Sequence, residues 1–262
     1  MQNFKLACQT ITWGEGQRNE FPTVFEQVAR AGYAGVEIGF RHIREIKPAD
    51  LAAMLDRQGL MLVASHIGGN LFDTQQAGRE RSMMDETLDY LEQMGTKLLM
   101  YSGLRYESDE QLATGIDMLN RAAQQAATRG VRLLYHNHDF EFAAGGKVVD
   151  ALLNDTVDAL GWCPDIGWVM RGGADVVEFL DKIKDRIGAV HFKDFAGDGS
   201  GEQRKVDTVV LGEGVAPLDE AAEWLKRNKS GLWVIAEQDR ADVPAGEAAA
   251  RNAAYLKRAL AL

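Results

Sequence analysis

The sequence has few of the features that mark a secreted or membrane protein. Only two cysteines, Cys8 and Cys163, occur among 262 residues, and both lie inside apolar strand-like runs. We therefore expect reduced core thiols and no disulfide. No apolar run approaches the roughly eighteen residues of a transmembrane helix, and the first residues lack the charged region and apolar core of a secretion signal. We expect a cytoplasmic protein without a membrane partner.

The chain also lacks a basic cluster and a phosphate-binding loop. Its formal net charge is -10 at pH 7, and no block of five or more basic residues occurs, which argues against nucleic acid as a partner. The segment after the first apolar run reads TITWGEG (residues 10–16), without the glycine fingerprint of a dinucleotide-binding sheet. No linker rich in Pro, Gly or Ser divides the chain. We expect one domain, spanning residues 1–262.

What the sequence does contain is a regular alternation of strand-like and helical segments. Strands are expected within residues 4–13, 35–38, 60–65, 97–101, 131–135, 159–163, 187–190 and 232–236. Helices are expected within residues 20–31, from 48 onward, and within 79–95, 107–129, 147–154, 174–184, 217–227 and 245–260, the fifth of them short and weakly signalled. Such alternation predicts a parallel sheet. Eight units in this length predict a closed (β/α)8 TIM barrel.

Polar residues follow several of the apolar runs directly. The stretch VRLLYHNHDFEF (residues 131–142) changes from buried-strand composition to a crowd of ligands and acids. Three other runs also end at a histidine or carboxylate. Because the ends of all strands in a barrel meet at one rim, we expect these four residues to converge: His136, Asp165, His191 and Glu237.

Two imidazoles and two carboxylates form a mixed nitrogen and oxygen ligand set. That set suits Mn²⁺, Co²⁺, Zn²⁺ or Fe²⁺ better than Ca²⁺ or a thiolate-preferring ion, and Mn²⁺ is the cofactor we expect first. Each residue alone has a structural alternative, since a strand-terminal histidine often only hydrogen-bonds and a strand-terminal aspartate often caps the next helix. Their occurrence at four separate strand ends favours a metal site over these alternatives.

Further candidates surround the four proposed ligands. His138 and Glu141, just past the fifth strand, are candidate acid/base groups, and Glu141 replaces His136 as the ligand if that strand runs longer. Lys193 shares a strand face with His191 and is suited to hold a substrate oxygen, with a buried ion pair as the alternative. The candidate substrate-binding residues are Trp13, Glu37, His66, Trp168 and Arg240.

One connection is unusually long and polar. Residues 195–217 follow the seventh strand, on the expected active face, and contain the segment GDGSG. A lid over the site and a passive surface loop explain it equally well. Apart from Arg240, no basic or Gly-rich phosphate site follows the last two strands, which favours a substrate without phosphate.

Several motifs together resemble the xylose-isomerase-like barrel superfamily, the sugar phosphate isomerase/epimerase group, over nearly the whole chain. They are ITWG (11–14), AGYAGVEIG (31–39), YHNHDFEF (135–142), CPDIGW (163–168), RIGAVHFKD (186–194), LGEG (211–214) and AEQD (236–239). The resemblance implies a divalent-metal barrel enzyme that polarises a ketose or hydroxyketone and moves a proton at the adjacent carbon.

Two positions depart from the epimerases of that group. His136 stands where many of them carry a glutamate that is both ligand and catalytic base, and Trp168 stands where a histidine often follows the sixth-strand Asp. The Tyr-His-x-His pattern resembles the inosose dehydratase branch more closely. This resemblance implies elimination of water next to the ketone of a keto sugar or cyclitol.

The resemblance also implies roles for individual residues. Glu237 or His138 would remove the proton, Lys193 would help to hold the enediolate, and Glu141 would protonate the leaving hydroxyl. Isomerisation or epimerisation of a ketose or 3-keto sugar begins with the same proton transfer and remains an alternative. An endonuclease of the superfamily would need more ligands and a basic groove, and a sugar-binding barrel without catalysis is the remote third reading. Homo-oligomers are common in the group, and the sequence does not specify the oligomeric state.

Overall fold

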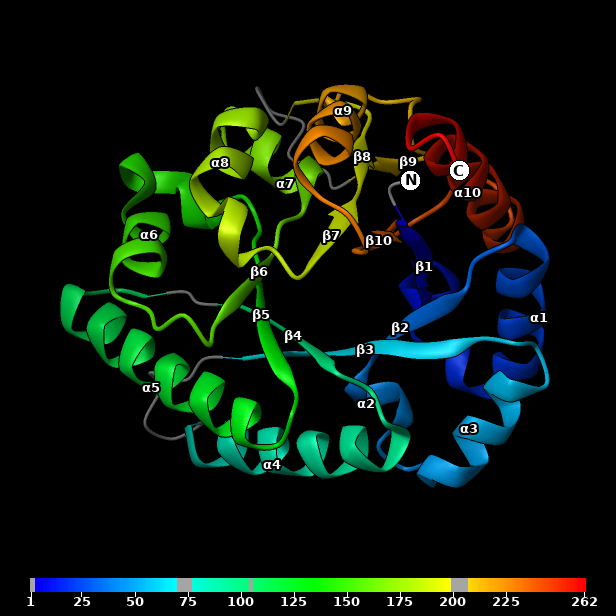
Figure 1. The fold of residues 1–262 in the computed structure, drawn as a ribbon, viewed down its shortest axis with the longest axis horizontal. Helices are drawn as coiled ribbons and strands as arrows, with labels where there is room; N and C mark the ends of the chain where they lie inside the picture. The colour runs from blue at the N-terminus through cyan, green and yellow to red at the C-terminus, as the bar shows by residue number, and fades with distance from the viewer. Residues whose placement is uncertain (1–2, 70–76, 104–105, 199–206) are drawn as a thin grey trace.

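A computed structural model describes residues 3–69, 77–103, 106–198 and 207–262 (Figure 1). Eight parallel strands form the centre of the molecule, and helices surround them, which confirms the predicted (β/α)8 barrel. The barrel strands are β1 (Lys5–Gln9), β2 (Gly35–Gly39), β3 (Met61–Gly68), β4 (Leu98–Ser102), β5 (Arg132–His136), β6 (Gly161–Cys163), β7 (Ala189–Phe192) and β10 (Trp233–Ala236).

The strands follow one another around the barrel in chain order, and the ring closes at two seams. β1 pairs with β2 on one side and with β10 on the other, so the first and last strands are neighbours. The parallel bridges Trp162↔Ile187 and Asp165↔His191 join β6 to β7. Because the second of these bridges connects two proposed ligands, the barrel seam itself holds them side by side.

The helices that cover the barrel are amphipathic, with their apolar faces toward the strands. Their bounds are α1 (Phe21–Ala31), α2 (Phe40–Ile43), α3 (Pro48–Asp56), α4 (Ala77–Met94), α5 (Asp109–Thr128), α6 (Ala143–Asn154), α7 (Ile166–Arg171), α8 (Val176–Ile183), α9 (Leu218–Asn228) and α10 (Ala245–Ala259). The outer ring of helices also closes. Tyr33, just after α1, donates a hydrogen bond from its Oη to the carbonyl of Ala249 in α10 at 3.0 Å.

The first predicted strand is too long, because β1 ends at Gln9. The next four residues, Thr10–Trp13, form a 3₁₀ helix that turns the chain across the barrel rim. Gln9 begins this turn, since its Oε1 accepts a hydrogen bond from the Ile11 amide at 2.6 Å. A side chain that caps the following turn competes with further strand pairing, which the apolar pattern of the run did not reveal.

Two other segments differ from expectation. Helix α6 begins at Ala143, earlier than predicted. Its first turn contains Gly145 and Gly146, which have low helix propensity, so the sequence did not indicate a helix there. In the long connection after β7, β8 (Asp194–Phe195) pairs antiparallel with β9 (Thr208–Val209). Most of the GDGSG segment lies outside the described residues, so the choice between lid and passive loop remains open.

The barrel interior is built in layers, which determines where the site can form. An apolar layer fills the centre and consists of Ala7, Val63, Ala64, Met100, Leu134, Cys163, Ala189 and Ile235. Successive inward-facing residues of a strand are two positions apart. The next inward residues toward the carboxyl ends are polar, and they include the four predicted ligands: His136, Asp165, His191 and Glu237.

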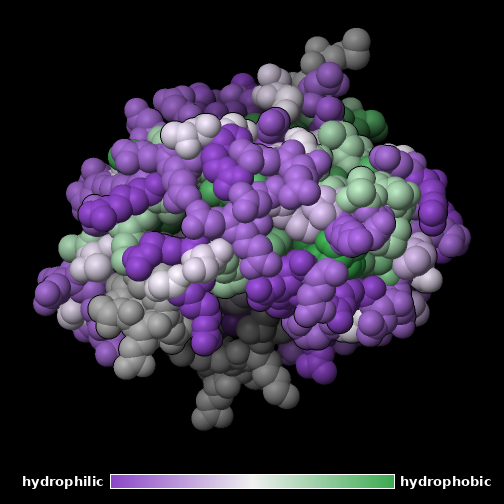
Figure 2. All heavy atoms as spheres, turned by 90° about the horizontal axis from the view of Figure 1, so that it is seen from below, coloured by the Kyte–Doolittle hydropathy of each residue, from purple (hydrophilic) through white to green (hydrophobic). Residues whose placement is uncertain are grey.

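The face of the molecule in Figure 2 is mainly polar. Seen from below the view of Figure 1, the face in Figure 2 is dominated by hydrophilic side chains, with hydrophobic spots separated by them. Among the residues that the structure describes, no helix combines the length and the apolar character needed to cross a membrane.

Asp194 organises the segment that follows β7. Its carboxylate accepts hydrogen bonds from the amides of Phe195, Gly212, Gly214 and Ala216 at 2.9 to 3.0 Å. Gly214 must remain a glycine, because a Cβ there would come within 2.2 Å of the Phe195 carbonyl oxygen and 2.3 Å of Asp194 Oδ1. The LGEG motif thus wraps around one buried carboxylate beside the barrel mouth.

Replacing Asp194 by Asn should loosen this segment and lower the free energy of unfolding by about 2 kcal/mol, because an amide oxygen cannot accept all four hydrogen bonds. Hydrogen exchange of residues 210–216 and urea unfolding measure the two effects. Glu213→Gln is the matched control in the same segment, since its exposed ion pair with Arg251 contributes little. Equal protection in both variants would contradict the role of Asp194.

Candidate functional site

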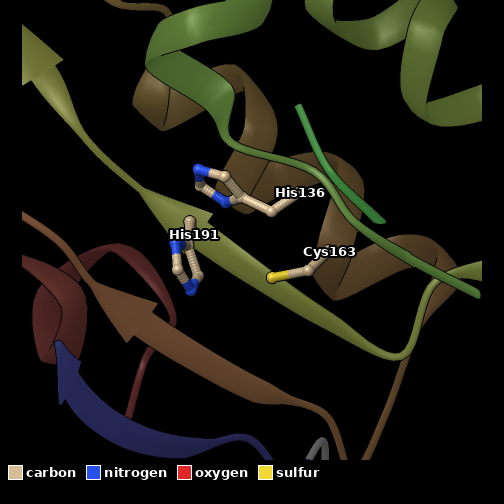
Figure 3. Close-up of side chains that lie close together, drawn as sticks. All are labelled: His136, Cys163 and His191. Atoms are coloured by element: carbon tan, nitrogen blue, oxygen red, sulfur yellow. The ribbon is translucent and has the colours of Figure 1, made fainter. Parts of the chain in front are cut away.

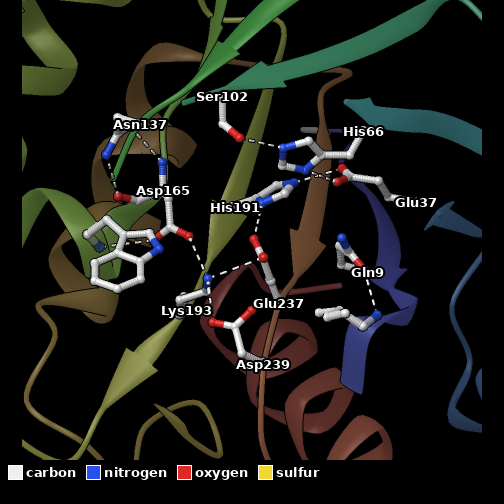
Figure 4. Close-up of polar contacts among 12 residues, drawn as sticks. Gln9, Glu37, His66, Ser102, Asn137, Asp165, His191, Lys193, Glu237 and Asp239 are labelled. Carbon is white, nitrogen blue, oxygen red and sulfur yellow. Dashed lines mark hydrogen bonds and ion pairs between the residues drawn. The ribbon is translucent and has the colours of Figure 1, made fainter. Parts of the chain in front are cut away.

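The structure brings together the four residues that the sequence predicts as ligands. His136, Asp165, His191 and Glu237 each offer one ligand atom, and these four atoms all lie within 4.8 Å of one another. All four side chains are buried at the mouth of the barrel. Figure 4 shows Asp165, His191 and Glu237, and Figure 3 shows His136 beside His191. The cluster therefore has the size and composition of a site for one divalent ion.

Asp165 serves two purposes with its two oxygens. Oδ1 caps helix α7 by accepting a hydrogen bond from the Trp168 amide at 2.9 Å. Oδ2 is buried and has no hydrogen-bond partner among the described residues, although Lys193 Nζ lies 3.6 Å away. Asn137 holds the Asp165 backbone from the neighbouring strand, because its Oδ1 accepts from the Asp165 amide at 3.1 Å. The capping role and the proposed ligand role are thus compatible.

His136 is the last residue of β5 and points into the cluster. Its Nδ1 is buried without a hydrogen-bond partner in the described part of the chain. Burial lowers the pKa of His136 well below its ordinary value, so the imidazole is neutral and has a lone pair available for a metal. An unsatisfied buried nitrogen is costly, and a bound cation would satisfy it.

His191 lies between two carboxylates on opposite sides of its ring. Its Nδ1 contacts Glu237 Oε2, and its Nε2 lies 2.8 Å from Glu37 Oε2. Burial acts to lower the pKa of His191, but the carboxylates of Glu37 and Glu237 outweigh it and raise that pKa well above its ordinary value. In the absence of a metal, this ring therefore carries the positive charge that its neighbours require.

Lys193 provides the other positive charge in the site. Its Nζ lies 2.9 Å from Asp239 Oδ2, 3.2 Å from Glu237 Oε1 and 3.6 Å from Asp165 Oδ2. Although burial opposes its charge, these three carboxylates raise the pKa of Lys193, so the ammonium persists at neutral pH. Its Nζ also lies 5.2 Å from the centre of the Trp168 ring.

The charges in this region leave room for a cation. In the described part of the chain, four carboxylates, those of Glu37, Asp165, Glu237 and Asp239, face two cationic groups, His191 and Lys193. Burial raises the pKa of Asp165 to about 7, while Lys193 and His191 outweigh burial and lower that of Glu237 well below its ordinary value. A divalent ion would balance the excess negative charge, and the donor atoms fit it.

Cys163 adds a sulfur to the same region. Its side chain lies beside His136 and His191 (Figure 3), and one ligand atom from each of the three falls within 4.8 Å of the others. Burial raises the pKa of Cys163 to about 11, so the thiol is protonated near neutral pH. Neither cysteine is in a disulfide, as predicted. The thiol forms the floor of the cluster.

The predicted acid/base residues His138 and Glu141 lie next to the cluster, outside its ligand set. Glu141 is fully buried, and its oxygens accept hydrogen bonds from Tyr135 Oη at 2.9 Å and from the His138 amide at 2.8 Å. The ring of His138 is half-buried and lies 5.1 Å from the ring of His136. Among the two alternatives for the fifth strand, the structure brings His136 to the cluster.

The predicted substrate-binding residues separate into two groups. Glu37, His66 and Trp168 border the cluster, and the buried Trp168 Nε1 has no hydrogen-bond partner among the described residues. The Trp13 indole instead donates to Gln27 Oε1 at 2.8 Å, and Arg240 is exposed on the segment after β10. Direct contact of any of these residues with a substrate remains a prediction.

Sequence reasoning missed four residues that complete this region: Ser102, Asn137, Cys163 and Asp239. Ser102 and Cys163 face inward on their strands, and the alternation of strand residues would have identified both. Asp239 follows Glu237 by two residues and was therefore detectable in the same way. Asn137 acts through backbone contacts between strand ends, for which the sequence carries no comparable signal.

The raised pKa of Glu141 predicts how the stability of the protein depends on pH. Burial raises this pKa from 4.5 to about 7, so the folded protein binds a proton that the unfolded chain releases, and stability falls as pH rises through this window. Compared with Glu141→Gln, the metal-free wild type should lose up to about 3 kcal/mol more between pH 4.5 and 7. Urea unfolding across this range measures the difference, and parallel profiles would contradict it.

Comparison with known proteins places the chain in a family. An inosose dehydratase from Clostridium beijerinckii is 24% identical, with 98% of this chain and 97% of the relative aligned. A sugar phosphate isomerase/epimerase from Parabacteroides distasonis has a TM-score of 0.79 at 20% identity, over 97% of this chain and 93% of that chain. The IOLI protein, with a bound zinc atom, has a TM-score of 0.79 at 18% identity, over 98% of both chains. Residues 25–259 match the family model, and the chain belongs to the xylose isomerase-like TIM barrel family.

Proposed function

We propose that this protein is a metal-dependent enzyme that acts on a keto sugar or cyclitol. It removes a proton next to the ketone and, in the reaction we favour, eliminates water. The observation that carries this proposal is the cluster of His136, Asp165, His191 and Glu237, with buried donor atoms that lack hydrogen-bond partners among the described residues. Buried polar atoms of this kind are rare unless a ligand satisfies them.

The relatives support the chemical class of the substrate. The aligned relative from Clostridium beijerinckii is named an inosose dehydratase and matches this chain over nearly its full length. The structural neighbours include a protein named a sugar phosphate isomerase/epimerase and one that binds zinc. These names favour a small polyhydroxylated ketone as the substrate class. The polar, partly aromatic mouth of the barrel suits such a substrate.

When bound, a divalent ion would act as a Lewis acid toward the substrate ketone and its neighbouring hydroxyl. Glu237 or His138 removes the proton from the adjacent carbon. Lys193, held by Asp239 at 2.9 Å, stabilises the negative charge that develops on the substrate oxygen. Glu141, with a pKa of about 7, holds the His138 backbone and supplies a proton for the leaving hydroxyl.

The aromatic residues favour a carbohydrate over a more hydrophobic ligand. The Trp168 ring lies 5.5 Å from the ring of His138 and presents an apolar surface beside polar groups. Apolar faces of sugar rings pack on such surfaces, while hydroxyls need donors like the buried Trp168 Nε1. Trp13, His66 and Arg240 complete the substrate-binding residues that we propose.

Metal analysis tests the ion site directly. We expect purified wild type to bind close to one equivalent of Mn²⁺, Zn²⁺, Co²⁺ or Fe²⁺, and to lose it in Asp165→Ala, His191→Ala and His136→Ala, because each change removes one of four ligands. Mass spectrometry of metal content measures the result. Glu213→Gln, on the exposed surface, serves as the control that retains the metal. Activity that persists in metal-free Asp165→Ala would overturn the assignment.

Incubation with inososes and 3-keto sugars in D₂O separates the proposed reaction from its alternative. Dehydration should give a product lighter than the substrate by one water. Epimerisation or isomerisation, the second candidate, would return a product of substrate mass that carries deuterium. Mass spectrometry distinguishes the two. Binding of these compounds without turnover, equally tight in metal-free protein, would instead indicate a sugar-binding barrel without catalysis.

A further inference from the structure

Glu37 occupies an unusual position beneath the mouth of the barrel. It lies in the middle of β2 and is completely buried, yet its carboxylate contacts two imidazoles from other strands. Oε2 lies 2.8 Å from His191 Nε2, and Oε1 lies 3.4 Å from His66 Nδ1 (Figure 4). Glu37 is outside the set of four proposed ligands, so these contacts need a separate explanation.

The two nitrogens of His191 face different partners. Nδ1 faces Glu237, which belongs to the ligand cluster, whereas Nε2 faces Glu37, which does not. An ionised carboxylate can only accept hydrogen bonds, so the nitrogen beside Glu37 must carry the hydrogen. When His191 is a neutral ligand, its lone pair is then on Nδ1, the nitrogen that points into the cluster.

We propose that Glu37 is a positioning residue of the metal centre, which holds His191 in the one tautomer and orientation that present Nδ1 to a divalent ion. The inference rests on the proposed metal site and assigns Glu37 a role through His191 in place of the direct substrate contact expected from the sequence. Carboxylates that accept the second N–H of a metal-bound histidine raise the affinity of such sites.

The same carboxylate connects the metal centre to the more open wall of the barrel. His66 Nε2 lies 2.8 Å from Ser102 Oγ, and the His66 ring lies 5.3 Å from the ring of His136. With its Nδ1 hydrogen directed at Glu37, His66 can accept the Ser102 hydroxyl hydrogen at Nε2. Glu37 therefore hydrogen-bonds the proposed ligand His191 through Oε2, while its Oε1 lies near His66 without a hydrogen-bond partner among the described residues.

Metal affinity tests this role. We expect Glu37→Leu to raise the dissociation constant for Zn²⁺ alone about 10- to 100-fold, because the leucine cannot accept the Nε2–H hydrogen bond. Glu37→Gln keeps an acceptor oxygen and should lose less than Glu37→Leu. Glu213→Gln, an exposed carboxylate outside the cluster, is the control and should bind Zn²⁺ as wild type does. Competition with a chelating dye measures the three constants.

The outcomes separate this inference from the proposed function. Wild-type protein that binds no ion would overturn both. A folded Glu37→Leu that binds Zn²⁺ as tightly as wild type, or an equal loss in Glu37→Leu and Glu37→Gln, would overturn only the positioning role.

A second measurement avoids the need for a folded variant at position 37. In Zn²⁺-loaded wild type, ¹H–¹⁵N spectra of the histidine rings should show His191 protonated at Nε2 and bound to the metal through Nδ1. The loss of these signals in His191→Gln assigns them. A ring bound through Nε2 would contradict the role of Glu37, whatever the behaviour of the variants.

Discussion

The cost of burying charge is the constraint on which the rest of the site depends. Glu37, Asp165, His191, Lys193 and Glu237 are each no more than about 5% exposed. A charge removed from water must be paired and hydrogen-bonded, or it is lost by protonation. Carboxylates and cationic groups therefore alternate around the barrel mouth. Asp165 Oδ2 and His136 Nδ1 have no hydrogen-bond partner among the described residues, and they mark the space where a cation fits.

The barrel is able to impose this pattern because its interior is organised in layers. Small and apolar side chains such as Ala7, Ala189 and Ile235 fill the centre, and the next inward position on each strand reaches the mouth. The side chains there come from strands far apart in the sequence, yet the parallel register holds their backbones at fixed heights. Hydrogen bonds behind them, such as the two between Asn137 and the Asp165 backbone, hold the strand ends that carry these side chains.

Much of this architecture was predictable, and the reasons are local. Apolar runs of strand length that alternate with amphipathic helices identify the barrel without any knowledge of contacts. A polar residue directly after a buried run, as in the case of His136 after Leu133 to Tyr135, identifies a strand end at the rim. The errors have local causes as well. Gln9 ended the first strand by capping a turn, and two glycines obscured the start of α6.

The sequence by itself determined the fold class and the four candidate ligands, because strand periodicity and strand ends are written in neighbouring residues. Only the tertiary structure decided how the individual atoms are used. It assigned one oxygen of Asp165 to the cap of α7 and left the other for the cluster, and it turned Glu141 toward Tyr135 and His138. It also placed Glu37 against His191, a contact between residues 154 positions apart. Such pairings depend on strand register across the closed barrel, which no local pattern encodes.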